Sequence, residues 1–321
     1  MKHFKMKDGP FIYSKDSVCS MMKRLIFAFV PILMLYFYQY GIVPFYSHNF
    51  GVFVLFCPFI FVMIPAFVYY GVDLFFARFI FQKKDNDLKY HMKHSSYFMY
   101  GIVLGLIIPV HTSIILMVIG SFVGAFCGKV IYCGFNRYVF HPSLIGQVFI
   151  FTFYSIMSQF YNEYLSFYES NFIIFSLFYL FLFFYLAFTK TIKWKIPVFY
   201  IGIVCLMSFM VGLYQGVNLF VQIMSRGLFI GAVFVVTDSL VSPVTSFGQV
   251  IYGIVLGILT VCLHCFVPYM ECVFTSILIM NLFVSVIDKM GNWAKFNRDI
   301  IGVSSLVLIF TIGVITCIIG V

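Results

Sequence analysis

The sequence predicts an all-α polytopic membrane protein of ten or eleven transmembrane helices, and two observations lead to this fold class. Of the 321 residues, 63% are hydrophobic and only 10% are charged, with a mean hydropathy of +1.04. Continuous apolar runs of about 20 residues recur along the whole chain, which is the length that a bilayer requires. Because backbone polar groups in lipid must be satisfied within their own segment, these runs are helices rather than strands.

The order of the apolar runs gives the expected organisation of the chain. They fall near residues 22–40, 50–72, 97–110, 113–133, 142–160, 171–189, 197–214, 221–237, 248–266, 270–287 and 300–320. The third and fourth runs are either two short helices or one helix broken at Pro109, so the count is ten or eleven. The longest polar stretch, Gln82 to Ser96, reads as a loop. Asp288 to Asp299 carries Trp293 and reads as a short amphipathic piece at the inner interface.

We therefore divide the chain into four parts. They are a cytoplasmic tail (1–24), a first transmembrane half (25–160), a second transmembrane half (161–287), and an interfacial segment with an extra C-terminal helix (288–321).

The positive charges predict the orientation of the chain. The formal net charge of +9 is carried by short loops, so it indicates membrane topology rather than nucleic-acid binding. Lys and Arg gather in alternate segments, at 2–24, 78–93, 129–137, 190–195 and 289–298. The N-terminus is thus expected on the cytoplasmic side of a bacterial inner membrane. The first apolar run is long and lacks a cleavage site, so it does not read as a signal peptide.

Two polar stretches interrupt the apolar pattern. The first polar stretch runs from Gly128 to Ser143 and the second from Thr237 to Gln249, and each contains Pro and hydroxyl residues. Irregular backbone at membrane depth is tolerated where it is buried in protein, and a pair of such breaks is typical of inverted-repeat transport folds. The alternative is that each is a cytoplasmic turn with a helix cap. Asp238 favours the functional interpretation, because an acid without a basic neighbour at the end of an apolar run is costly.

Three acids are candidates for an ion pathway: Asp73, Asp238 and Glu271. For Asp73 the alternative is an interfacial acid paired with Arg78, and for Glu271 it is a position at the outer boundary. The Cys262-x-x-Cys265 pair, with Cys272 beyond it, reads as small side chains packed in helices rather than as a metal site. No pattern of catalytic residues is recognised.

The two polar stretches resemble the signature segments of the RnfD/NqrB family. In the first, Gly128, Lys129, Tyr132, Gly134, Phe140 and Pro142 match, while His141 and Ser143 stand where the family has Asn and Ala. In the second, Thr237, Asp238, Ser242, Pro243, Thr245, Gly248 and Gln249 match. Further similarities at residues 14–22, 194–197 and 271–288 extend the resemblance over nearly the whole chain.

The resemblance implies a membrane subunit of an Rnf- or Nqr-type electron-transport complex that translocates ions. It also implies two inverted five-helix repeats, as in urea and ammonium channels. Such a subunit is at most non-catalytic or flavin-carrying, and its partners are the other Rnf or Nqr subunits and the bilayer. The alternatives are a transporter of flavin or another small solute, and a structural partner for an extracytoplasmic flavoprotein.

One departure from the family concerns flavin. No Gly-Ala-Thr occurs in the chain, so the covalent FMN implied by the family is not expected. A non-covalent riboflavin or FMN site stays open. An isoalloxazine ring needs apolar walls and a few aimed polar groups, and the two polar stretches could supply them. The resemblance places its candidate residues in the two polar stretches. They are Gly128, Lys129, Gly134, Asn136, Phe140, Pro142, Asp238, Ser242, Pro243, Thr245 and Gly248.

Overall fold

The computed structural model contains helices and no strand over the residues that it describes. These are residues 18–48, 53–80, 82, 84–95, 97–108, 112–131, 139–154, 177–215, 227–238, 241–266 and 271–296. Within them, five helices are long and apolar enough to cross a membrane, and four shorter apolar helices accompany them. The predicted fold class, an all-α polytopic membrane protein, is confirmed.

The N-terminal half begins with two long helices that contain π-helical turns. Its elements are α1 (Val18–Phe37), η1 (Tyr38–Ile42), α2 (Val43–His48), α3 (Phe53–Phe75), η2 (Phe76–Ile80), α4 (Asp85–His94), α5 (Tyr97–Ile107), α6 (Ile114–Ala125), η3 (Phe126–Val130) and α7 (Pro142–Tyr154). The third and fourth apolar runs are therefore two separate helices, and Pro109 lies outside the described residues. The prediction of a loop at Gln82 to Ser96 was wrong. Asp85 and Asp87 stand in the first turn of α4, where they complement the helix dipole.

The C-terminal half also combines long and short helices. It contains a helix at Leu177–Phe188, then α9 (Lys195–Gln215), α11 (Leu228–Ile230), η5 (Gly231–Val235), α12 (Ser246–Phe266) and α13 (Glu271–Phe296). Each half contains a short helix whose residues are almost all buried, α5 in one and α11–η5 in the other. The last turns of α13 contain most of the amphipathic piece predicted at Asp288 to Asp299, and its position at the inner interface stays a prediction. The apolar run at 300–320 lies outside the described residues.

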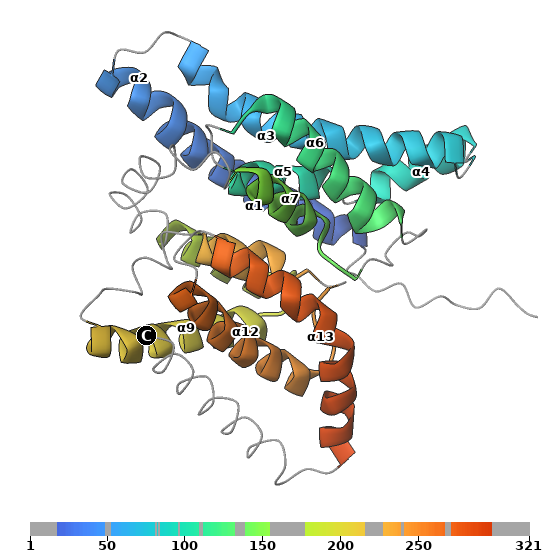
Figure 1. Cartoon of the computed structure of the whole chain (residues 1–321). Coiled ribbons are helices and arrows are strands. Elements are labelled where there is room, and N and C mark those ends of the chain that lie inside the picture. The colour runs from blue at the N-terminus through green and yellow to red at the C-terminus, as the bar shows by residue number, and fades with distance from the viewer. Residues whose placement is uncertain are drawn as a thin grey trace, which may run out of the picture.

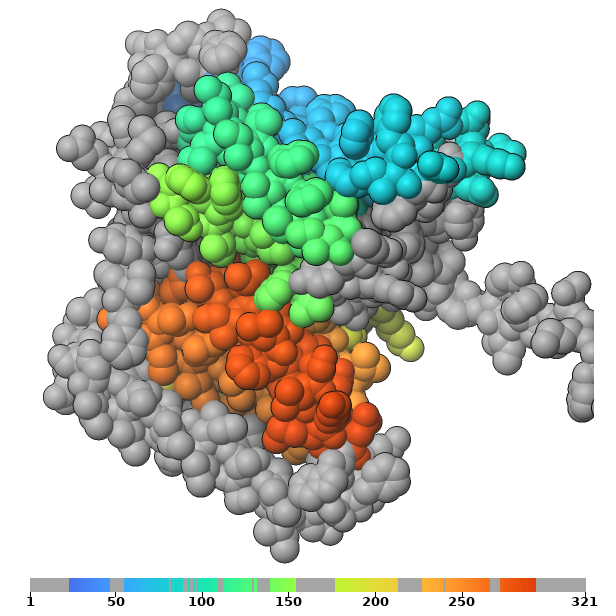
Figure 2. All heavy atoms as spheres, turned by 45° about the vertical axis from the view of Figure 1, so that its right-hand side comes forward, coloured from blue at the N-terminus to red at the C-terminus, as the bar shows by residue number. Residues whose placement is uncertain are grey.

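The two halves form two groups of helices that pack against each other. In Figure 1 the blue to green helices lie above and the yellow to red helices below. Figure 2 shows the same division on the surface. Within the halves α3 packs on α5 and α6, and α12 packs on α9 and α13. Between the halves α7 contacts α13.

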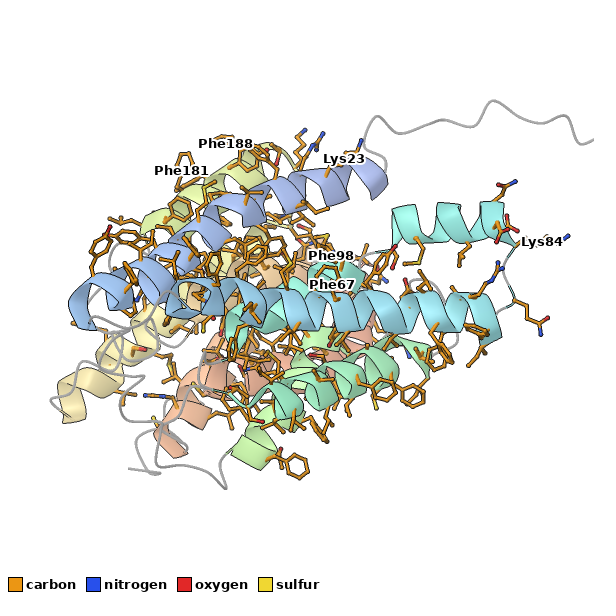
Figure 3. All side chains as sticks on the ribbon, turned by 90° about the horizontal axis from the view of Figure 1, so that it is seen from above. Lys23, Phe67, Lys84, Phe98, Phe181 and Phe188 are labelled. Carbon is orange, nitrogen blue, oxygen red and sulfur yellow. The ribbon has the colours of Figure 1, made fainter. Side chains whose placement is uncertain are left out.

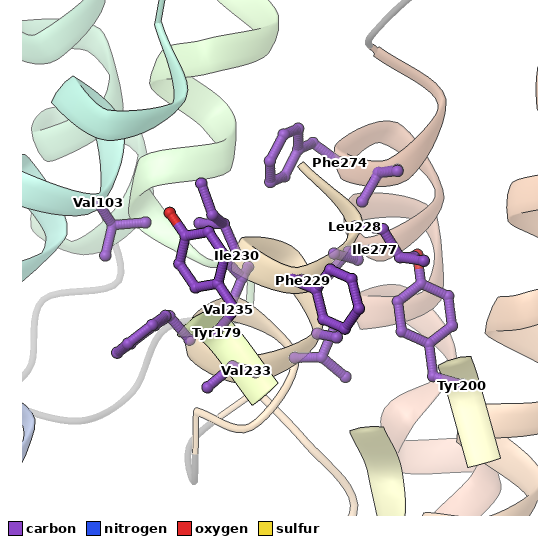
Figure 4. Close-up of a cluster of buried hydrophobic side chains, with 14 of the residues drawn as sticks. Val103, Tyr179, Tyr200, Leu228, Phe229, Ile230, Val233, Val235, Phe274 and Ile277 are labelled. Carbon is purple, nitrogen blue, oxygen red and sulfur yellow. The ribbon is translucent and has the colours of Figure 1, made fainter. Parts of the chain in front are cut away.

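The short helix α11–η5 lies in the centre of the apolar core. All eight of its residues are buried, and Figure 4 shows them surrounded by Val103 of α5, Tyr179, and Phe274 and Ile277 of α13. Phe234 of this helix stacks on Phe29 of α1, with ring centroids 4.6 Å apart. Packing from both halves thus fixes this helix, and with it the second polar stretch that follows.

The outer surface is apolar where lipid is expected. Figure 3 shows Phe181 and Phe188 projecting from the helix at Leu177–Phe188 beside α1, and Phe188 is 83% exposed. Lys23 lies near this helix in the same view, whereas Lys84 lies far from both, where α4 follows α3. Arg24 donates to the Thr189 carbonyl at 2.8 Å, so the basic segment that ends at Arg24 meets the one that begins at Lys190.

The crossing of α3 and α5 depends on a glycine. A Cβ on Gly101 would lie 2.4 Å from the Cα of Ala66 and 2.7 Å from the Pro65 carbonyl oxygen. We expect Gly101→Ala to lower the free energy of unfolding by about 1–3 kcal/mol, because the contact is with backbone that cannot move aside. Thermal unfolding in detergent measures this. The control is Gly71→Ala, where a Cβ meets nothing within 4 Å, and equal melting temperatures for the two variants would contradict the expectation.

Candidate functional site

The two polar stretches meet at Asp238, at the junction between the two halves. The Tyr100 hydroxyl, on α5, donates to Oδ2 of Asp238 at 3.0 Å. Nε2 of His141, just before α7, lies 3.8 Å from the same oxygen. The Tyr100 and His141 rings meet edge to face at 4.9 Å. The described ends of the stretches are therefore buried against each other rather than forming two separate surface turns.

The first polar stretch is fixed by contacts around Pro142. Tyr69 donates from its hydroxyl to the Pro142 carbonyl at 2.9 Å, and Ser143 donates to the Tyr100 carbonyl at 2.9 Å. A Cβ on Gly128 would lie 2.7 Å from the Cα of Pro142, so only glycine allows η3 to approach the start of α7. These bonds hold His141 and Tyr100 in place beside the acid.

The second polar stretch is held by Lys193, in the loop before α9. Its ammonium donates to the Ser242 carbonyl at 3.0 Å, the Ser242 hydroxyl at 2.9 Å and the Pro243 carbonyl at 3.1 Å. The Ser242 hydroxyl in turn donates to the Asp238 carbonyl at 2.6 Å. Burial lowers the pKa of Lys193, and the charges of Asp238 and Asp288 oppose that change. The expectation that Asp238 has no basic neighbour was wrong, because Lys193 is brought near it by the fold.

Asp288 of α13 anchors the other end of the second polar stretch. Its carboxylate accepts from the Val244 N–H, the Thr245 N–H and the Thr245 hydroxyl, each at 3.0 Å. Thr245 also caps α12, because its hydroxyl oxygen accepts from the Gly248 N–H at 3.2 Å. The second polar stretch is thus held by Lys193 on one side and by Asp288 on the other.

Removing the Asp288 carboxylate is expected to loosen this segment. We expect Asp288→Ala to lower the free energy of unfolding by about 1–3 kcal/mol, because two backbone N–H groups and a hydroxyl lose their acceptor. Hydrogen exchange of residues 241–249 checks this, with Asp87→Ala on the exposed face of α4 as the control. Unchanged protection of the segment in Asp288→Ala would count against the anchoring role.

His141 is uncharged at neutral pH. Complete burial lowers its pKa from 6.5 to about 4, and the nearby charge of Asp238 opposes that shift without cancelling it. Its contact with Asp238 is therefore one between a neutral imidazole and a carboxyl group. Nδ1 of His141 has no hydrogen-bond partner among the described residues.

Asp73 is a second buried acid, on α3. The Ser95 hydroxyl donates to Oδ2 of Asp73 at 2.5 Å, and the residue is 6% exposed. Arg78 is not its partner, as the alternative interpretation had it. Arg78 pairs instead with the exposed Asp85, at 2.5 Å. Glu271 is the first residue of α13, and its side chain lies outside the described part of the structure.

The described candidate residues for flavin binding contact one another and two further residues, Lys193 and Asp288. Gly128 packs on Pro142, the Ser242 hydroxyl bonds to Lys193 and to backbone, and the Thr245 hydroxyl bonds to Asp288. Gly134, Asn136 and the side chain of Lys129 lie outside the described residues. In the described parts of the two stretches, Nδ1 of His141 is the only buried side-chain polar atom without a partner. An isoalloxazine ring needs apolar walls and several aimed polar groups, and a flavin site at these residues stays a prediction.

Fold and site together define a polytopic membrane protein with a buried acid at the junction of two helical halves. The chain belongs to the NQR2, RnfD, RnfE family, whose model matches residues 5–169 and 167–297. This confirms the resemblance found in the two polar stretches.

Three relatives show how the similarity is distributed. The D-type subunit of the ion-translocating oxidoreductase complex of Actinobacillus succinogenes is 22% identical over 357 residues, covering 89% of this chain and 96% of that protein. The D-type subunit of the proton-translocating ferredoxin:NAD(+) oxidoreductase complex of Clostridium ljungdahlii is 38% identical over 116 residues, 35% of each chain. The Na(+)-translocating counterpart of Acetobacterium woodii is 34% identical over 105 residues, 33% of this chain and 32% of that protein. The chain thus matches nearly all of the first relative but only about a third of the other two.

Proposed function

We propose that this chain is the D-type membrane subunit of an ion-translocating ferredoxin:NAD(+) oxidoreductase complex in a bacterial cytoplasmic membrane. The names of its relatives support this proposal. Its N-terminus lies on the cytoplasmic side, which fits the contact of Arg24 with Thr189, just before the basic segment at 190–195. The other subunits of the complex supply the redox chemistry.

The observation that carries the proposal is the position of Asp238. It touches Tyr100 and His141 of the N-terminal half while it belongs to the C-terminal half. Any movement of one half relative to the other changes these contacts, and with them the affinity of the carboxylate for a cation. Electron passage through the partner subunits can then shift the equilibrium between two arrangements of the halves, which couples it to ion movement.

Purification of the tagged full-length chain from its native host tests the proposal. We expect the other membrane subunits to copurify, and vesicles containing the complex to take up ions when reduced ferredoxin and NAD+ are supplied. Recovery of the chain alone, with uptake of a labelled small solute by vesicles that hold only this protein, would support a transporter instead.

Non-covalent flavin and an extracytoplasmic flavoprotein partner stay predictions. The proposed ion transport does not depend on either of them. The visible absorption of the purified protein, before and after addition of riboflavin or FMN, tests binding directly. A spectrum without flavin bands in both samples would remove that prediction.

A further inference from the structure

A cationic cluster lies at the end where α1 and the helix at Leu177–Phe188 meet. Nη1 of Arg24, near the start of α1, donates to the Thr189 carbonyl at 2.8 Å. Lys23 precedes Arg24 in the chain, and Lys190 follows Thr189. Because α1 belongs to the N-terminal half and Thr189 to the C-terminal half, the cationic cluster of Lys23, Arg24 and Lys190 lies across the two halves.

The two lysines of this cationic cluster are available to a ligand from outside the chain. The side chains of Lys23 and Lys190 are exposed, and neither forms a hydrogen bond or an ion pair within the part of the chain that the structure describes. Lys193 and Lys195, by contrast, both bond to the second polar stretch. The cluster therefore presents two positive charges that no described acid pairs with.

Lys190 has a backbone conformation that glycine normally adopts. Its φ is 53°, in the left-handed region. Its N–H donates to the Ala187 carbonyl and the Thr191 N–H donates to the Leu186 carbonyl, each at 3.0 Å, which is the Schellman pattern of a helix end. A side chain in this conformation costs stability, and Arg24 already supplies a cation to this helix end. The strained position of this lysine thus indicates that its ammonium has a use outside the chain.

Exposed apolar side chains continue from the cationic cluster along both helices. Phe27 packs on Tyr185 of the neighbouring helix, with ring centroids 6.2 Å apart, so the two helices lie side by side. Figure 3 shows Phe181, Phe188 and Lys23 along one edge of the molecule. The exposed apolar residues are Phe27, Val30 and Met34 on α1, at helical spacing from Lys23, and Phe181, Phe184 and Phe188 on the other helix. This surface is therefore cationic at one end and apolar along its length.

This distribution of charge matches an anionic phospholipid. A phosphate accepts charge-assisted hydrogen bonds from Lys and Arg, and acyl chains pack on exposed apolar side chains. Each Lys or Arg near the membrane surface increases the affinity for anionic lipid about fivefold. A zwitterionic lipid gains less, because its own cation balances its phosphate. The positive-inside rule accounts for cations at this end of the helices, but it does not require one in a strained turn beside exposed rings.

We propose that the cationic cluster binds the phosphate of one anionic phospholipid, whose acyl chains lie along the exposed apolar residues that begin at Phe27 and Phe188. Arg24 takes part because a guanidinium has five N–H donors, more than its bond to Thr189 uses. Bound in this way, the lipid links a helix of the N-terminal half to a helix of the C-terminal half and holds the two halves together. None of the residues that touch Asp238 takes part, so lipid binding is separate from the proposed ion transport.

Lipid binding to the purified full-length chain in a neutral detergent tests this proposal. The probes are dioleoylphosphatidylglycerol, dioleoylphosphatidylcholine and the soluble headgroup analogue glycerol phosphate. Native mass spectrometry measures the affinity, and thermal unfolding measures the stabilisation by bound lipid.

Two test variants and two matched controls are compared. Lys190→Gly and Lys23→Gln each remove one cation of the cluster. Gln82→Gly changes an exposed residue with a φ of 47°, so it alters the same backbone conformation without loss of a charge. Lys84→Gln removes an exposed lysine that lies far from the cluster.

We expect wild type to bind phosphatidylglycerol at least about tenfold more tightly than phosphatidylcholine, and each test variant to bind it about fivefold more weakly than wild type. Without lipid, Lys190→Gly is expected to melt no lower than wild type, because relief of the left-handed turn offsets the greater freedom of glycine in the unfolded chain. Both controls are expected to bind like wild type. Equal affinities of wild type for the two lipids would overturn the proposal. Equal losses in Lys84→Gln and the test variants, or stabilisation by glycerol phosphate as large as that by phosphatidylglycerol, would overturn it as well.

Discussion

Asp238→Asn is expected to reduce ion transport by the reconstituted complex at least about 100-fold. Asparagine has nearly the shape of aspartate and can still accept the hydrogen bond from Tyr100, so the junction between the halves is preserved. The amide cannot bind and release a proton or neutralise a cation, however. The variant therefore separates the charge of the group from its packing, and the transport rate per copurified complex measures the result.

Two further variants make this expectation specific. Asp238→Glu retains the carboxylate and is expected to keep part of the transport. Asp87→Asn removes a carboxylate from the exposed face of α4 and is expected to behave like wild type. Full transport in Asp238→Asn, with correct assembly of the complex, would show that the ion does not use this acid.

Acidification is expected to destabilise the protein through His141. The pKa of His141 is about 4 in the folded protein against 6.5 ordinarily, so the unfolded chain binds the proton first as the pH falls. The stabilisation of the folded state by neutral His141 is complete above pH 6.5 and is lost as the pH falls toward 4. Between pH 7 and pH 4 the loss is about 3 kcal/mol. Melting temperatures in detergent across this range measure it.

His141→Asn is the matched variant, because it replaces the imidazole with the residue that the family pattern has at this position. Other groups also titrate between pH 7 and pH 4, so the informative quantity is the difference between the two proteins. We expect the melting temperature of wild type to fall more steeply than that of His141→Asn. If the melting temperatures of the two proteins fell equally with pH, protonation of His141 would not destabilise the fold.

The apolar pattern predicted the helices well, because hydropathy alone decides which segments are in the bilayer. The run at 197–214 became α9 at Lys195–Gln215, and the run at 248–266 became α12 at Ser246–Phe266. The π-helical turns were not predictable, since each changes one turn within an apolar run whose composition stays the same. The continuation of α13 was missed because its charged last turns resemble a separate interfacial helix.

The site was predicted in part. Asp238 could be found because a lone acid next to an apolar run is conspicuous. Its partner Tyr100 is one of 22 tyrosines and lies 138 positions away, so nothing local distinguishes it. Lys193 and Asp288 read as an ordinary basic loop and an interfacial acid. Their roles depend on long-range packing, which the order of residues along one chain does not specify.

The unbroken length of α13 has a mechanical consequence. With 26 residues its backbone path is about 39 Å long, and Figure 1 shows the helix bending before its last turns. Asp288, close to these turns, accepts hydrogen bonds from the second polar stretch. A neighbouring protein that moves the last turns would therefore also displace the backbone beside Asp238.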